Sequence, residues 1–222
     1  MRNYKRITLL CGHYGSGKTN VAVNMAFDLK KQHENVALAD LDIVNPYFRA
    51  KDSMETLKAA GIRLICSEYA NSNVDIPALP QDMYAISDDR SLKCILDIGG
   101  DDRGALALGR LAPAILEEND YEMLMVINSA RPLSRDAAST LEIMREIETA
   151  GGIRFTGLVN NTNLGAETTA EDVLASLPYA KEVAELSGLP IVATSVREDL
   201  IAELEGKVVD LFPLQLQKHE IL

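Results

Sequence analysis

The sequence predicts an α/β fold, a doubly wound and mainly parallel sheet with helices on both of its faces. Short apolar runs alternate with amphipathic stretches along most of the chain, which is the pattern of strands buried between two layers of helices. Nearly every apolar run ends in Asp, Asn or Gly, as expected where parallel strands bring polar residues to one edge of a sheet. No linker, repeat or low-complexity segment divides the 222 residues, so we expect a single domain over residues 1–222.

The expected strands are apolar runs of three to five residues, bounded by polar residues or glycine. The first of them, residues 7–11, reads ITLLC and is rich in aliphatic residues, as a buried strand should be. The remaining strands are expected at residues 36–39, 63–66, 94–96, 123–127, 155–159 and 190–193.

The expected helices carry apolar residues that recur every three or four positions. The first covers residues 17–31, where Val21, Met25 and Leu29 lie on one face. The second covers residues 134–150 and the third residues 169–177. The apolar stripe of the second helix consists of Ala137, Leu141, Met144 and Ile147.

Residues 12–19, GHYGSGKT, lie between the first expected strand and the first expected helix and fit the phosphate-binding pattern GxxxxGK[ST] at every fixed position. Glycines let backbone N–H groups surround a phosphate without a Cβ in the way, and the helix N-terminus adds its positive end. Lys18 would act as a catalytic residue on the β- and γ-phosphates, and the Thr19 hydroxyl would help to hold Mg²⁺. The expected nucleotide-contacting residues of this segment are Gly12, His13, Tyr14, Gly15, Ser16, Gly17, Lys18, Thr19 and Asn20.

Two acidic strand ends are candidates for metal and water chemistry. Asp97 ends an apolar run and precedes residues 98–100, Ile-Gly-Gly. We expect Asp97 to hold Mg²⁺ through water, with the glycines letting the backbone move when a γ-phosphate is present. Asp40 and Asp42 would point to opposite sides of the sheet if the second strand continues through them. One of them would then contact the metal or the attacking water, and we expect Asp42 to be that catalytic residue and metal contact.

The overall charge narrows the range of partners. The net charge of −11 disfavours binding to the phosphate backbone of DNA or RNA and to anionic membranes. No apolar run approaches the length of a membrane span, and the run at residues 7–11 is too short for a signal-peptide core. We therefore expect a cytoplasmic protein that binds neither nucleic acid nor membrane.

The three cysteines, Cys11, Cys66 and Cys94, are widely spaced, and no pair forms a C-x-x-C motif. This spacing argues against a zinc or iron–sulfur site within one chain. Cys11 and Cys94 fall in expected strands, where small buried thiols are favoured over ligand or redox roles.

Together these landmarks resemble the MinD/ParA-type deviant Walker ATPases, the group that includes the nitrogenase iron protein and the CobQ/CobB-like nucleotide-binding domains. The resemblance covers most of the chain through residues 12–19, 40–42 and 97–100 and the strand end at Asn128. It implies a P-loop NTPase fold with ATP and Mg²⁺ as cofactors. It also implies that residues 40–42 act as switch I and residues 97–100 as switch II.

The same resemblance implies roles for single residues. By similarity, Asp42 would orient water and Asp97 would serve Mg²⁺. Asn160 or Asn161 looks like the family's base-reading residue, because an Asn amide can both donate to and accept from the adenine edge. No (N/T)-K-x-D guanine motif follows any expected strand, which favours ATP over GTP.

The loop departs from the family pattern at one position. The family loop usually reads KGGxGK[ST], and its first lysine crosses a dimer interface to the partner's nucleotide. Here that position is His13, followed by Tyr14, and an unperturbed imidazole is mostly neutral at neutral pH. The formation of a nucleotide-dependent homodimer is therefore an open question, and Arg49 or Arg103 could supply the positive charge instead of the lysine.

Three functions are open, and the first is favoured: a Mg-ATP-binding ATPase that acts as a nucleotide-dependent switch for a protein partner. Tyr47 and Phe48 would then either face that partner or pack under the loop. The second is an ATP-dependent small-molecule kinase or ligase of the CobQ or dethiobiotin synthetase type. The third is a nucleotide-binding regulator without turnover, which the missing lysine makes credible. For the kinase or ligase, the substrate pocket would consist of Tyr47, Arg49, Arg131 and Arg135.

Overall fold

The computed structural model describes residues 2–41, 54–66, 81–99, 102–134 and 136–216. Within these residues eight strands form one sheet in the order β3-β2-β4-β1-β5-β6-β7-β8. Every neighbouring pair in this sheet is parallel. The predicted fold class, a doubly wound parallel α/β sheet, is confirmed.

Strands and helices alternate along the chain. The strands are β1 (Ile7–Cys11), β2 (Val36–Leu41), β3 (Arg63–Cys66), β4 (Lys93–Ile98), β5 (Tyr121–Ile127), β6 (Gly157–Asn160), β7 (Ile191–Arg197) and β8 (Leu211–Leu214). The α-helices are α1 (Lys18–Lys30), α2 (Met54–Ala59), α3 (Ala85–Asp88), α4 (Asp102–Glu118), α5 (Ala137–Gly151), α6 (Ala170–Ser187) and α7 (Ile201–Leu204). Short 3-10 helices are η2 (Gln81–Tyr84), η3 (Pro132–Ser134), η4 (Gly165–Glu167) and η5 (Glu198–Leu200).

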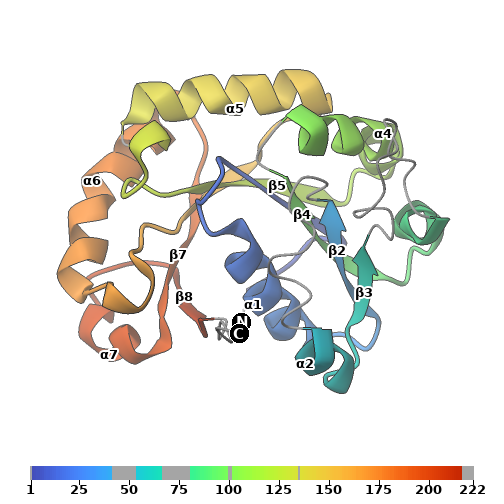
Figure 1. The fold of residues 1–222 in the computed structure, drawn as a ribbon, viewed down its shortest axis with the longest axis horizontal. Helices are drawn as coiled ribbons and strands as arrows, with labels where there is room; N and C mark the ends of the chain where they lie inside the picture. The colour runs from blue at the N-terminus through green and yellow to red at the C-terminus, as the bar shows by residue number, and fades with distance from the viewer. Residues whose placement is uncertain (1, 42–53, 67–80, 100–101, 135, 217–222) are drawn as a thin grey trace, which may run out of the picture.

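The sheet separates two layers of helices (Figure 1). α1 and α2 cover one face, and α4, α5 and the C-terminal half of α6 cover the other. Side chains alternate accordingly along β1, where Leu9 and Cys11 face α4 and α5 while Leu10 faces α1. Among the described helices, none combines the length and the apolar content required to span a membrane.

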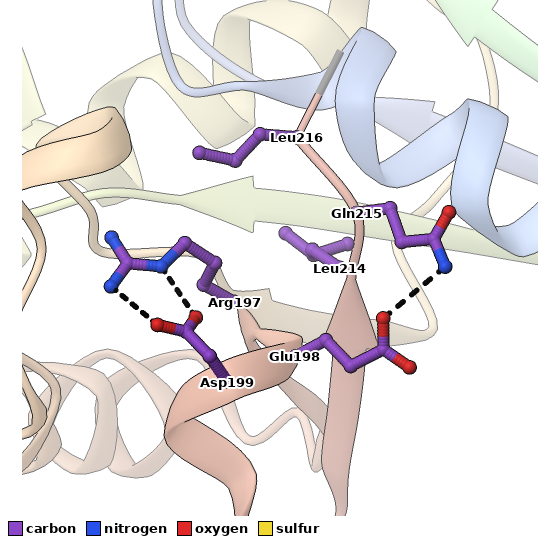
Figure 2. Close-up of a pocket in the computed structure, with 6 residues that line it drawn as sticks. All are labelled: Arg197, Glu198, Asp199, Leu214, Gln215 and Leu216. Carbon is purple, nitrogen blue, oxygen red and sulfur yellow. Dashed lines mark hydrogen bonds and ion pairs between the residues drawn. The ribbon is translucent and has the colours of Figure 1, made fainter. Parts of the chain in front are cut away.

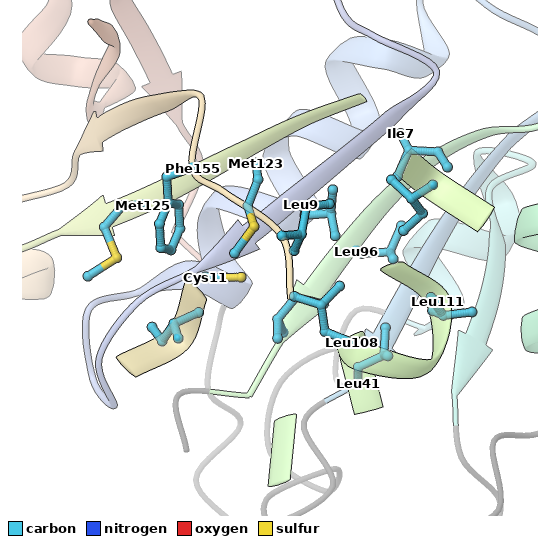
Figure 3. Close-up of a cluster of buried hydrophobic side chains, with 14 of the residues drawn as sticks. Ile7, Leu9, Cys11, Leu41, Leu96, Leu108, Leu111, Met123, Met125 and Phe155 are labelled. Carbon is cyan, nitrogen blue, oxygen red and sulfur yellow. The ribbon is translucent and has the colours of Figure 1, made fainter. Parts of the chain in front are cut away.

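The layer between the sheet and α4 is built from aliphatic and sulfur-containing side chains. Figure 3 shows Leu9 and Leu96 of the sheet in one cluster with Leu108 and Leu111 of α4, close to Met123. All five are at most 3% exposed. Burial on both faces explains why the strands read as continuous apolar runs rather than as alternating ones.

Helix α6 is longer than the sequence pattern predicted. The expected helix ended at residue 177, directly before Pro178. Proline lacks the N–H that a helix interior uses. The observed helix passes through Pro178 and ends at Ser187. Ala180 and Val183, beyond the proline, are fully buried in the core, and their packing offsets the lost backbone hydrogen bond.

The C-terminal part of the sheet also differs from the prediction. β7 reaches Arg197 instead of residue 193, and β8 was not predicted. In the middle of the chain, α4 was not predicted either. β8 contains Pro213, and proline is unfavourable inside a sheet. β8 lies at the edge of the described sheet, however, where one N–H is not needed for pairing.

β1 occupies the point where the direction of strand order reverses. It pairs with β4 on one side and with β5 on the other. At such a reversal the loops on either side diverge and leave a crevice beyond the carboxyl ends of the strands. The loop over residues 12–19 leaves β1 at this point, so the fold places it where ligands bind in open α/β sheets.

Candidate functional site

The loop over residues 12–19 requires glycine at its two consensus positions. Gly12 and Gly17 have φ angles of 149° and 88°, values that residues with a side chain rarely adopt. A Cβ atom at Gly12 would lie 2.5 Å from the Val126 carbonyl oxygen, and one at Gly17 would lie 2.3 Å from Asn161 Nδ2. Glycine is therefore required at both positions for two reasons, the backbone conformation and the short distance to neighbouring atoms.

Lys18 lies folded back over the loop. Its side chain is buried, and Nζ donates a hydrogen bond to the His13 carbonyl oxygen at 3.4 Å. The Ser16 N–H donates to the same oxygen at 3.1 Å. α1 begins after Gly17 without a side-chain cap, so the loop combines an ammonium group with the positive end of a helix. This arrangement suits a phosphate group.

Thr19 and Asp97 meet next to Lys18. The Thr19 hydroxyl donates to Asp97 Oδ2 at 2.5 Å, and the Asp97 side chain is buried. Asp97 pairs in register with Leu10 of β1 and with Asp40 of β2. Because Leu10 belongs to the core layer under α1, residues in register with it also face α1.

This register places Asp40 beside Asp97, on the α1 side of the sheet. Asp40 is 7% exposed and Asp97 is 3% exposed, so two carboxylates lie buried near the helix that carries Lys18. Asp42, the residue of the same segment that was predicted to be catalytic and to contact the metal, lies outside the described residues. Its role in orienting water stays a prediction.

The residues at this point fit a Mg²⁺ ion. Mg²⁺ takes oxygen ligands and, in phosphate-binding sites, usually takes only one or two from the protein. The Thr19 hydroxyl and the Asp97 carboxylate are such oxygen donors in direct contact. In the described parts of the chain, no group of three or more His, Cys, Asp or Glu side chains could hold a metal by itself. These two protein oxygens therefore match a Mg²⁺ site whose remaining ligands come from phosphate and water.

His13 and Tyr14 lie on the outer side of the loop. His13 Nδ1 lies 2.9 Å from the Tyr14 carbonyl oxygen, and the Tyr14 side chain is 65% exposed. Asn20 follows Thr19 in the first turn of α1, and its carbonyl oxygen accepts from Asn24 Nδ2 at 2.8 Å. The part of His13 in replacing the family lysine stays a prediction.

The two asparagines at the end of β6, Asn160 and Asn161, have different partners, although each is 1% exposed. Asn160 Nδ2 donates to Ser176 Oγ at 2.8 Å, and Asn160 Oδ1 accepts from the Thr162 hydroxyl at 3.0 Å. Asn161 Nδ2 donates to the Ser16 carbonyl oxygen at 2.7 Å. The structure thus brings Asn161 to the phosphate loop and leaves Asn160 against α6. Base reading by either residue stays a prediction.

Arg131 reaches the phosphate loop from the turn after β5. Its Nε donates to the Gly15 carbonyl oxygen at 2.8 Å, and the side chain is exposed. The turn is held by Asn128, whose Oδ1 accepts from the Ala130 N–H at 3.0 Å and whose carbonyl accepts from Ser134 Oγ at 2.9 Å. Two consecutive loop carbonyls, Gly15 and Ser16, are therefore held by side chains from neighbouring strand ends.

Several other predicted site residues cannot be placed. The backbone and side chains of Asp42, Tyr47, Phe48, Arg49, Gly100 and Arg135 and the side chain of Arg103 lie outside what the structure describes. The proposed roles of these residues in switching, charge supply and substrate binding stay predictions.

A groove at the carboxyl ends of β7 and β8 was missed by sequence reasoning (Figure 2). Its volume is about 400 Å³. Arg197 donates to both carboxylate oxygens of Asp199 at 2.5 and 2.8 Å, which lowers the pKa of Asp199, and Gln215 Nε2 donates to Glu198 at 3.2 Å. The groove is lined by Arg197, Glu198, Asp199, Leu214, Gln215 and Leu216.

The groove is tied to the helix that carries the phosphate loop. Asn24 of α1 accepts from the Gln215 N–H at 2.9 Å and donates to the Gln215 carbonyl oxygen at 3.0 Å. Asn24 lies six residues after Lys18, about 9 Å along the helix axis, so α1 connects the groove to the phosphate loop. No sequence signal could have located the groove, because one of its walls is formed by β8, which was not predicted, and the residues that follow it.

Comparison with known families decides the relationship. The CobQ/CobB/MinD/ParA nucleotide binding domain matches residues 7–191. The chain belongs to this family. The match runs from β1 to the start of β7 and includes the phosphate loop, both acidic strand ends and the asparagines at the end of β6. The resemblance inferred from the sequence is therefore confirmed, and no curated protein matches the chain.

Solved structures share the fold of this CobQ/CobB/MinD/ParA domain. Cell division protein FtsY from Thermotoga maritima superposes with a TM-score of 0.60 at 18% identity, over 86% of this chain and 61% of its own. Chloroplast FtsY from Physcomitrella patens gives 0.57 at 17% identity, over 87% and 59%. FtsY from Mycoplasma mycoides gives 0.54 at 16% identity, over 86% and 59%. The chain spans about three fifths of these proteins, and identities this low show the fold alone.

Proposed function

We propose that this domain binds Mg-ATP and hydrolyses it as a nucleotide-dependent switch for a protein partner. The observation that carries the proposal is the convergence of Lys18, Thr19 and Asp97 at the glycine loop, where β1 meets α1. Lys18 would leave the His13 carbonyl and bind the β- and γ-phosphates. Thr19 and Asp97 would hold Mg²⁺, which neutralises phosphate charge when bound.

The groove next to Asn24 supports the placement of the base in this proposal. Leu216 offers partly exposed apolar surface to a flat ring, and polar groups of Glu198 and Gln215 lie at the edge of the groove. ATP is preferred over GTP because no (N/T)-K-x-D motif follows any strand. Asp42, which the family resemblance makes the water-orienting residue, completes the proposed hydrolytic site.

The partner side of the proposal is supported by the outer face of the loop. Tyr14 is 65% exposed, and an exposed aromatic side chain at the phosphate loop is suited to contact a second protein. A second copy of the chain is one such partner. Sedimentation velocity of the wild type and of Tyr14→Ser, with and without a non-hydrolysable ATP analogue, tests whether the chain dimerises. A dimer that forms only with the analogue and is weakened in the variant supports a second copy as the partner. A monomer with and without the analogue rejects it.

A kinase-like function is the second candidate, and the position of Arg131 favours it. Its guanidinium is held at Gly15 and exposed at the edge of the phosphate loop, where it could attract an anionic substrate. The two candidates differ in their product. A phosphorylated metabolite would identify the kinase, whereas free phosphate alone would identify the ATPase.

The deciding experiment is steady-state phosphate release from Mg-ATP by the purified protein. Lys18→Ala should reduce turnover by about 100-fold, because it removes a charge that acts on the transferred phosphate. Lys31→Ala is the matched control: Lys31 follows the same helix with 69% of its side chain exposed, and its loss should leave turnover unchanged. If the wild type binds ATP without turnover, the protein is a nucleotide-binding regulator rather than an ATPase. If it does not bind ATP, the proposed function is rejected.

A further inference from the structure

A chain of hydrogen bonds links β7 to the phosphate loop through Asn161. Ser195 Oγ donates to Asn161 Oδ1 at 2.6 Å. Asn161 Nδ2 donates in turn to the Ser16 carbonyl oxygen at 2.7 Å. All three residues are at most 2% exposed, so water does not compete for these bonds and they are costly to leave unmade.

The two bonds fix the orientation of the Asn161 amide. An amide presents a donor on one side and an acceptor on the other. If the amide turned over, its oxygen would face the Ser16 carbonyl oxygen, and two acceptors would meet in a buried position. The hydroxyl of Ser195 favours the observed orientation further, because it has a proton to donate to Oδ1.

The held carbonyl controls the direction of a neighbouring donor. The Ser16 C=O and the Gly17 N–H belong to one peptide unit, and in a trans peptide they point in opposite directions. No described peptide bond is cis. Fixing Ser16 O toward Asn161 therefore directs the Gly17 N–H to the opposite side, toward the inside of the loop. Gly17 has no room for a Cβ on the Asn161 side, where Nδ2 would lie 2.3 Å away.

We infer that Asn161, oriented by Ser195, is a positioning residue that fixes the Ser16–Gly17 peptide so that its N–H can bind phosphate. This role rests on the proposed nucleotide binding and differs from base reading. It acts on the phosphate part of the ligand whatever base is attached. Because Ser195 lies two residues before Arg197 of the groove, the same strand serves both parts of the site.

Inorganic tripolyphosphate distinguishes the two roles, because it has no base. The affinities of Mg-ATP and Mg-tripolyphosphate are measured by calorimetry for the wild type and for Asn161→Ala and Ser195→Ala. Asn161→Ala should weaken both ligands by the same factor, about tenfold, and Ser195→Ala should weaken both by about threefold. Ser195→Ala keeps Asn161 in place, so it carries the test even if Asn161→Ala fails to fold.

Ser176→Ala is the matched control. Ser176 is also a buried serine, bonded at 2.8 Å to the neighbouring Asn160, but neither residue contacts the phosphate loop in any hydrogen bond of the described structure. Its loss should lower the melting temperature while both affinities stay within about twofold.

Three results with the variants would overturn the inference. If Asn161→Ala loses affinity for ATP but not for tripolyphosphate, Asn161 reads the base. If the Asn161→Ala and Ser195→Ala variants fold and both affinities are unchanged, Asn161 has no role in binding. An equal loss in Ser176→Ala would show a general effect of destabilisation. If the wild type itself binds neither ligand, the proposed function fails first, and the positioning role fails with it.

Discussion

The hydroxyl of Thr19 donates a 2.5 Å hydrogen bond to the carboxylate of Asp97, which joins the first turn of α1 to the end of β4. These residues are 78 positions apart in the sequence. The contact brings a hydroxyl oxygen and a buried carboxylate together beside the phosphate loop, and each can serve as a ligand or as the support of a ligand.

Removing the Thr19 hydroxyl should uncouple nucleotide binding from Mg²⁺. Thr19→Val keeps the shape of the side chain but removes the oxygen, so the gain in ATP affinity on adding Mg²⁺ should fall by about tenfold or more. Thr19→Ser keeps the oxygen and should retain most of that gain. Titration of ATP with Mg²⁺ and with excess chelator measures the effect, and equal Mg²⁺ dependence in the valine variant would contradict it.

Gly17→Ala should damage both stability and nucleotide binding. The new Cβ would meet Asn161 Nδ2 at 2.3 Å, and the φ angle of 88° is unfavourable for alanine. We expect a loss of about 2–4 kcal/mol in the free energy of unfolding, from strain and overpacking together.

Gly152→Ala separates these two contributions. Gly152 also has a positive φ, of 66°, but a Cβ there would meet nothing within 4 Å. Its substitution should cost only about 1 kcal/mol and leave nucleotide affinity unchanged. Urea unfolding of both variants gives the comparison, and equal losses would show that the contact with Asn161 is not important.

Glu118→Gln should destabilise the fold far more than an exposed substitution of the same kind. Glu118 pairs with Arg6, and their side chains are 8% and 4% exposed. Arg6 also donates to the carbonyl oxygens of Ile86 and Leu92 at 2.9 and 3.0 Å, so it would stay buried without its counter-ion. Breaking such a pair costs about 3 kcal/mol.

Glu185→Gln is the exposed control for this pair. Glu185 lies 3.6 Å from Lys181 on α6, with side chains 66% and 76% exposed, and the loss should stay within about 0.5 kcal/mol. Chemical denaturation measures both variants. A loss below 1 kcal/mol for Glu118→Gln would show that the fold adapts to the uncompensated arginine.

The two buried thiols should be unreactive in the folded protein. Burial raises the pKa of Cys94 to about 12 and raises the pKa of Cys11 well above its usual range. Because the folded pKa values exceed the unfolded ones, this contribution to stability is complete below about pH 8.5 and is lost as the pH rises from there toward 12.

A Cys66→Ser variant isolates these two thiols for measurement with an aromatic disulfide reagent. A free thiol would react about twentyfold faster at pH 9 than at pH 7, in line with its thiolate fraction. We expect no such rise in the native variant and two reactive thiols after unfolding in urea. Rapid labelling of the native variant would show that one of the strands opens.

The core pattern explains how much of the fold could be predicted. Strands buried on both faces read as short aliphatic runs, and the six positions predicted for β1, β2, β3, β4, β5 and β6 all correspond to observed strands. The apolar residues of α1 were also predicted, and Val21, Met25 and Leu29 are fully buried. β8 could not be predicted because its pairing with β7 offsets an unfavourable sequence of four residues that includes proline.

The sequence by itself determined the phosphate loop, the family and the residue types available at the strand ends, because these depend on local spacing and on backbone conformations that glycine alone adopts easily. The tertiary structure decided which of those residues meet. It placed Asp40 beside Asp97 through strand register, and it brought Asn161 under Ser16 across 145 positions. Sequence spacing does not specify such contacts, because they depend on the order in which the strands join the sheet.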